Sequence, residues 1–304
     1  PRTALIAQVH PSQHRRLRWF LMVYTINMSD KYKAVWVSHS SMGDFIKCPR
    51  LYYLHNVYKD PRSGNKVAII SPHMSLGVAV HNVLENLVNF KKEERFSRDL
   101  FADYEENWKK VSGKIGGFES DAQEAEFKER GRVMLEKVIE NPGPLARLTV
   151  DFYKGDFLPN YWLNGEDDNI ILCGKVDWIE YLDDGTLRVI DFKTGKHDEK
   201  EGSLQFPIYH LLLNNLQKRK VSSAAYWYID RDTDLTEAQL PSVEESFKMV
   251  YEVAKQVRDA RAKNLYECPS GSEGCTHCRD YEKIIKGEAE FVGKGEYKQD
   301  LYIV

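Results

Sequence analysis

The sequence lacks several features that would assign it to a class at once. No apolar run approaches the roughly 20 residues needed to cross a bilayer, so an integral membrane protein is not expected. Five cysteines in 304 residues are too few for a secreted disulfide framework. Neither sign of charge is in large excess, because 43 Lys and Arg stand against 46 Asp and Glu, a net charge of −3. This balance excludes a globally basic DNA-coating protein but allows a local basic groove.

What remains is an ordinary globular composition, with 42% hydrophobic and 29% charged residues. The length is enough for one large domain with a substantial core, and no internal repeat is apparent. The sequence has no Gly-x-x-x-x-Gly-Lys-Ser/Thr loop, the phosphate-binding motif of P-loop nucleotide hydrolases. Three of the cysteines cluster near the end, which indicates metal ligation in a reducing cytoplasm.

The chain divides into segments of different character. We expect residues 1–27 to be an N-terminal extension ahead of a natural start at Met28, and residues 28–285 to form a mixed α/β domain. Within that domain, the highly charged residues 91–140 predict a helical subdomain, and 264–285 form a cysteine-rich segment. Residues 286–304 are expected to be a C-terminal tail.

Helices are predicted from capping signals and apolar spacing. Ser41-x-x-Asp44 predicts a helix beginning at Ser41, with Phe45, Cys48 and Tyr52 on one face. Residues 73–90 predict a second helix, whose apolar stripe is Leu76, Val80, Val83, Leu84 and Leu87. Gly77, His81 and Glu85 lie on an adjacent stripe four residues apart. Strands are expected between 148 and 193 and at 224–230, and helices at 203–219 and 241–263, which implies a mixed α/β domain.

A β-hairpin is the most informative part of the sequence. Two apolar strands, 170–181 and 187–192, are predicted to flank the loop Asp183-Asp184-Gly185. A three-residue loop of this kind usually makes a type I turn that ends with glycine in the left-handed region. Ile179 should therefore lie opposite Val189.

The same register places two carboxylates opposite each other. Asp177 faces Asp191, and Lys193 shares their face. Facing carboxylates repel, and in an interior their unpaired charge is costly. A divalent cation resolves both problems, and oxygen ligands at this density suit Mg²⁺ or Mn²⁺. Lys193 would then lie beside the metal, where it could position a water or balance charge on a phosphate.

A solvated hairpin is the alternative. The two aspartates would then face water or pair with Lys175 and Lys193. A two-residue Asp184-Gly185 turn would also move Asp177 to the other face.

Gly174-x-x-Asp177 followed by Asp191-Phe192-Lys193-Thr194-Gly195 resembles the core motif of the PD-(D/E)XK nucleases, in particular the RecB-like and CRISPR-associated exonuclease branch. Three further motifs agree in order. Phe45-x-x-Cys48-Pro49-x-x-Tyr52 resembles that branch's N-terminal cysteine motif, and Gly77-x-x-x-His81 resembles its metal-binding histidine helix. Gln205-x-x-x-Tyr209 resembles the helix motif that follows the lysine. The resemblance covers roughly residues 36–285.

This resemblance implies a restriction-endonuclease-like fold, a mixed central sheet flanked by helices. It implies that His81, Asp177, Asp191 and the Phe192 carbonyl hold Mg²⁺ or Mn²⁺, with Asp177, Asp191 and Lys193 catalytic. Gln205 and Tyr209 would contact DNA or orient the lysine.

Each of these side chains taken alone has a structural alternative. His81 would be a core or surface histidine, and Gln205 and Tyr209 would flank an apolar stripe. Glu85 could support the histidine, although we expect it to be exposed.

The clustered cysteines form a second candidate site. Cys275-x-x-Cys278 is the close thiolate pair of zinc and iron–sulfur sites, Cys268 is a third candidate ligand, and Cys48 is the expected fourth. The resemblance implies a 4Fe-4S cluster, although Ile284 stands where that branch usually has its last cysteine.

Zinc and unmetallated cysteines are the alternatives to an iron–sulfur cluster. His277 is a possible ligand in a zinc site, although we expect it to be exposed. Cys173 is expected to be a small buried hydrophobe.

Together these features predict a cytoplasmic, metal-dependent deoxyribonuclease. The expected mode is exonuclease action on single-stranded DNA ends in repair, recombination or CRISPR adaptation, with a helicase or CRISPR integrase as a candidate partner. The alternative is a catalytically weak DNA-binding or adaptor subunit of such a complex. A third reading, a zinc-stabilised hydrolase of another phosphate ester, predicts no affinity for DNA.

Overall fold

The computed structural model describes residues 33–152 and 158–304. The expected N-terminal extension, residues 1–27, and the start at Met28 lie outside the described residues. No helix in the described part of the chain is both long and apolar enough to cross a membrane.

The centre of the molecule is a four-stranded mixed sheet in the order β5-β6-β7-β8. β5 and β6 are antiparallel, β6 and β7 are parallel, and β7 and β8 are antiparallel. The strands are β5 (Trp178–Tyr181), β6 (Leu187–Lys193), β7 (Val221–Tyr228) and β8 (Thr236–Ala238).

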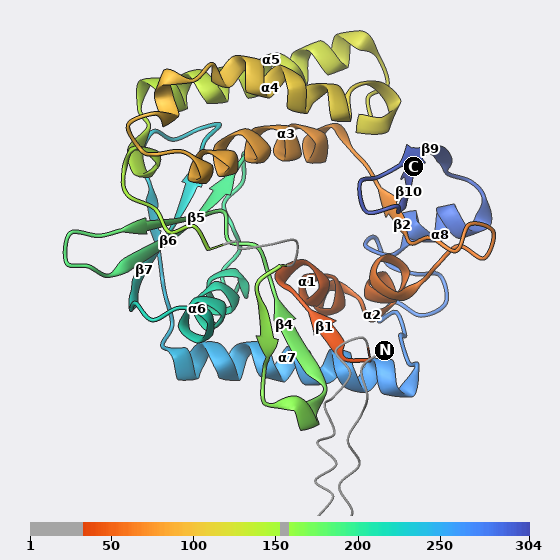
Figure 1. Ribbon diagram of the computed structural model, residues 1–304. Helices are drawn as coiled ribbons and strands as arrows, with labels where there is room; N and C mark the ends of the chain where they lie inside the picture. Colours follow the sequence, from red (N-terminus) through yellow and green to blue (C-terminus); the bar gives the residue numbers. More distant parts are fainter. Residues whose placement is uncertain (1–32, 153–157) are drawn as a thin grey trace, which may run out of the picture.

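Alternate residues of β6 face two different cores, so helices cover both faces of this sheet (Figure 1). Leu187 and Val189 pack on the side of helices α6 and α7, whereas Ile190 and Phe192 pack on the side of α3, α4 and α5. The helices are α3 (Pro72–Asn86), α4 (Leu100–Trp108), α5 (Asp121–Glu140), α6 (Gln205–Leu216) and α7 (Val243–Lys263). The predicted helical segment 91–140 thus supplies α4 and α5, which pack on α3 as an outer layer.

Two smaller sheets flank the central one. The first has the order β1-β4-β3, from β1 (Val35–Val37), β4 (Ile170–Cys173) and β3 (Asn160–Trp162). The second has the order β2-β10-β9, from β2 (Val67–Ile69), β10 (Asp300–Ile303) and β9 (Glu290–Lys294). It lies beside the short helix α8 (Arg279–Lys286), on the right of Figure 1. Residues 286–304 therefore supply two strands.

The predicted hairpin register is confirmed for the paired residues, which end at Trp178 and Ile190 and so do not include Asp177 and Asp191. Ile179 pairs with Val189, and the Leu182 N–H donates to the Thr186 carbonyl at 2.9 Å. Gly185 closes the loop with φ of +80°, in the left-handed region that favours glycine.

The prediction of one strand over 170–181 is wrong, because the chain changes sheets after Cys173. β4 belongs to the first small sheet and β5 to the central sheet. At Gly174 the chain passes so close to α6 that a Cβ would lie 3.0 Å from Leu212 Cδ1. Asp177 consequently stands just before β5, at its entry into the central sheet.

The predicted helix start at Ser41 is also wrong. Helix α1 runs over His39–Lys47 with Ser38 as its N-cap, and Ser41 is the third helical residue, the partner of Ser38 in a capping box. The helix stops at Cys48, which is extended (φ −169°, ψ 121°), because the following Pro49 disfavours helical geometry at the residue before it. Helix α2 then covers Pro49–Tyr52, so Cys48 lies at a break between two helices.

Candidate active site and cysteine centre

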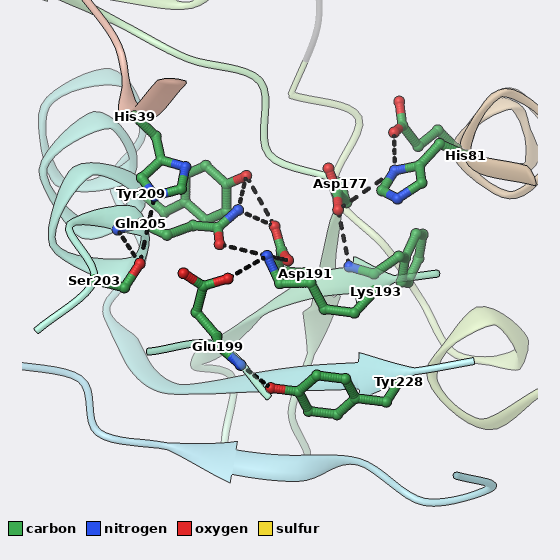
Figure 2. Close-up of polar contacts among 12 residues, drawn as sticks. His39, His81, Asp177, Asp191, Lys193, Glu199, Ser203, Gln205, Tyr209 and Tyr228 are labelled. Atoms are coloured by element: carbon green, nitrogen blue, oxygen red, sulfur yellow. Dashed lines mark hydrogen bonds and ion pairs between the residues drawn. The ribbon is translucent and has the colours of Figure 1, made fainter. Parts of the chain in front are cut away.

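His81 of α3 lies beside Asp177, which precedes β5 (Figure 2), and Glu85 lies beside His81 on the next turn of α3. His81 Nδ1 lies 3.0 Å from Glu85 Oε1 and 3.6 Å from Asp177 Oδ2. The Phe192 N–H donates to Asp177 Oδ2 at 2.8 Å. One donor atom from each of the three side chains lies within 4.8 Å of the others, a spacing that could hold a metal ion.

Helix α3 presents these groups because its apolar stripe is buried against the sheet. Leu76, Val80 and Val83 are almost fully buried, which turns the adjacent stripe of His81 and Glu85 toward Asp177. Gly77 allows the close approach, since a Cβ there would lie 3.3 Å from Thr194 Oγ1.

The expectation that Glu85 is exposed is wrong. Its side chain is 12% exposed, and it forms a close ion pair with Lys175 as well as the hydrogen bond with His81. The signal in the sequence was the four-residue spacing from His81, which places both side chains on one face of α3.

Asp191 and Lys193 form a second group, on the α6 side of the hairpin. Lys193 Nζ lies 2.8 Å from Asp191 Oδ2, and it donates to Gln205 Oε1 at 2.8 Å. Asp191 Oδ1 accepts hydrogen bonds from Gln205 Nε2 and, at 3.1 Å, from the Tyr209 hydroxyl. Gln205 and Tyr209 are buried in contact with Asp191, so these contacts orient the acid and the lysine.

Two residues near Lys193 were missed by sequence reasoning. Glu199 Oε2 lies 3.1 Å from Lys193 Nζ, and its backbone N–H donates to the Tyr228 hydroxyl at 2.9 Å. His39 is the first residue of α1, and its Nε2 lies 3.4 Å from Ser203 Oγ. The nearby positive charge of Lys193 helps to lower the pKa of His39, which burial lowers most. Both come from segments without a recognisable motif, so no sequence signal marked them.

The charges at Lys193 keep it protonated. Burial alone would lower the pKa of Lys193, but the carboxylates of Asp191 and Glu199 outweigh burial and raise it above its usual value. Its three N–H donors face Asp191, Glu199 and Gln205. The side chain is therefore a fixed positive charge in this arrangement.

The charges around Asp177 favour a cation beside it. Burial raises the pKa of Asp177 well above its usual value, and the nearby charge of Asp191 raises it further. Asp191 Oδ2 is itself buried, 2.8 Å from Lys193 Nζ. Repelling, buried carboxylates beside an imidazole fit Mg²⁺ or Mn²⁺.

The four predicted cysteines come together at a second place. Cys48, Cys268, Cys275 and Cys278 place their sulfurs within 4.8 Å of one another, and none is in a disulfide. Cys278 is fully buried, and Ile284, where a cysteine was expected from the resemblance, packs in the same small core. His277 is exposed and outside this group, as expected. Cys173 is buried elsewhere, in β4.

The comparison with known protein families agrees with this geometry. The sequence model of the PD-(D/E)XK nuclease superfamily matches residues 36–281, which is most of the chain. The chain belongs to this superfamily, and membership implies metal-dependent nuclease activity. A search of curated proteins gave no match.

Proposed function

We propose that this chain is a Mg²⁺- or Mn²⁺-dependent deoxyribonuclease of the RecB-like branch that acts as an exonuclease on single-stranded DNA ends. Repair, recombination or CRISPR adaptation would supply such ends, and a helicase or integrase would be a natural partner. One observation carries the proposal. An imidazole, two buried acids and a lysine, from His81, Asp177, Asp191 and Lys193, are all present and lie around the hairpin.

The site residues have two roles, metal binding and stabilisation of the phosphate. His81, Asp177, Asp191 and the Phe192 carbonyl would hold the ion, which when bound supplies Lewis-acid polarisation of the phosphate and a hydroxide near neutral pH. Lys193 places a positive charge where the scissile phosphate gains negative charge.

Three supporting side chains fix these groups. Gln205 and Tyr209 hold Asp191, and Gln205 also accepts from Lys193, so the acid and the lysine keep a fixed relative position. Glu85 holds the His81 ring through its hydrogen bond with Nδ1.

The test is degradation of end-labelled linear single-stranded DNA and of a circular single strand of the same composition, with Mg²⁺, Mn²⁺ or EDTA. We expect metal-dependent loss of the linear strand only, and its abolition in Lys193→Met. Lys196→Met is the matched control, because Lys196 follows three residues later and is exposed.

Several outcomes would overturn parts of this proposal. Cleavage of the circle would contradict the exonuclease mode. Retained DNA binding without cleavage by the wild type would support the adaptor alternative, and absence of DNA binding would support a hydrolase of another phosphate ester.

A further inference from the structure

The four cysteine sulfurs lie unusually close together for the cluster that the resemblance implies. Cys278 Sγ lies 3.8 Å from both Cys275 Sγ and Cys268 Sγ, and all four sulfurs lie within 4.8 Å of one another. Bound to one Zn²⁺ at about 2.3 Å in a tetrahedron, four sulfurs would be about 3.8 Å apart. The two separations of 3.8 Å match a single tetrahedral ion, and all four sulfurs lie within 4.8 Å of one another.

A 4Fe-4S cluster does not fit this arrangement. Its four iron and four sulfide atoms stand between the thiolates, which must lie farther apart than around one ion. The packing around the cysteines opposes such an increase in the separation of their sulfurs. Cys48 and Cys278 are fully buried in a small apolar core, so packed side chains enclose their sulfurs.

We propose that these cysteines bind one structural Zn²⁺ in place of an iron–sulfur cluster. Four thiolates close the coordination sphere, so the ion has no open position for chemistry. Zinc also has no redox chemistry, so oxidants would act on the thiolates alone.

The same site joins two distant parts of the chain. Cys48 lies at the break between α1 and α2, and its three partners lie more than 200 residues later, around the start of α8. Arg50 supports the junction, since it donates to the Ser272 carbonyl at 3.0 Å and pairs with Glu282 at 3.0 Å. The zinc therefore fastens α1, which begins with His39 beside the catalytic group, to the C-terminal segment.

The test is the metal content of full-length protein purified without oxygen from cells supplied with both iron and zinc. We expect about one zinc per chain, a colourless protein and no acid-labile sulfide. Replacement of zinc by Co²⁺ should give the visible absorption of tetrahedral cobalt thiolate. Cys268→Ser should lose the zinc on dialysis, whereas Cys173→Ser, which changes the fifth cysteine in β4, should retain it.

Three results would overturn the zinc assignment. A brown protein with about four iron and four sulfide per chain would establish the iron–sulfur cluster instead. Full zinc retention in Cys268→Ser would show that Cys268 does not bind the zinc. A protein with neither metal would show that the cysteines bind no metal. If Cys268→Ser does not fold, cobalt titration of the wild type still tests whether the cysteines bind one tetrahedral ion. None of these readouts depends on nuclease activity.

Discussion

Replacing Glu85 by alanine should weaken binding of the catalytic metal. Glu85 Oε1 lies 3.0 Å from His81 Nδ1, and a carboxylate there favours a proton on Nδ1, so Nε2 is the nitrogen that would bind a metal. Without the carboxylate the ring can rotate and exchange tautomers. Loss of such a partner typically costs 10–100-fold in metal affinity, about 1.4–2.8 kcal/mol. The fold should tolerate the change, because Lys175 is half exposed and water can replace Glu85.

The assay is calorimetric titration of the DNA-free protein with Mn²⁺, followed by cleavage rates across Mn²⁺ concentrations. Glu85→Ala should raise the Mn²⁺ concentration needed for half-maximal rate while the maximal rate recovers. Glu85→Gln should lose less, because its amide oxygen still accepts the Nδ1 proton. Asn86→Ala, at the exposed next residue of α3, is the matched control. Unchanged Mn²⁺ affinity in Glu85→Ala, with affinity lost in Asp177→Asn, would refute this role of Glu85.

Four further changes test the orientation of the site and the packing of the helices. Gln205→Ala removes contacts to both Asp191 and Lys193, so cleavage should fall by about 10–100-fold at saturating metal; an unchanged rate would contradict the orienting role. Phe192→Ala empties a buried position between α3 and the sheet, and urea unfolding should show that the free energy of unfolding falls by about 3–5 kcal/mol. A fall of less than about 1 kcal/mol would contradict this packing. Gly131→Ala would place a Cβ 2.0 Å from the Tyr104 hydroxyl and should lower the free energy of unfolding by about 1–3 kcal/mol. Gly43→Ala, in α1 with open space around it, should raise it by about 0.5–1 kcal/mol; equal effects of the two glycine changes would contradict the packing of α5 on α4.

Local patterns were enough to predict the hairpin and the histidine helix. The loop Asp183-Asp184-Gly185 sets the register of β5 and β6 by its length and by glycine's freedom at positive φ. The apolar stripe of α3 sets which face carries His81.

Features that depend on distant partners were not predictable in the same way. β2, β9 and β10 have three to five residues each, and β2 joins the neighbouring strands β9 and β10 only because segments more than 200 residues apart meet. The approach of Glu199 to Lys193 comes from a loop without periodicity. The break at Gly174 lies where the chain passes close to Leu212 of α6, a proximity that an apolar run along one strand does not reveal.

The most direct test of the nuclease assignment is an isosteric change at the buried acid. Asp191→Asn keeps the shape and the contacts to α6 but removes the charge that faces Lys193 and the metal position. With labelled single-stranded DNA and Mn²⁺, the wild type should cleave, and the variant should be as inactive as the wild type in EDTA while still binding DNA. Wild-type cleavage by Asp191→Asn, or cleavage that persists in EDTA, would contradict the assignment of the hairpin as a metal-dependent active site.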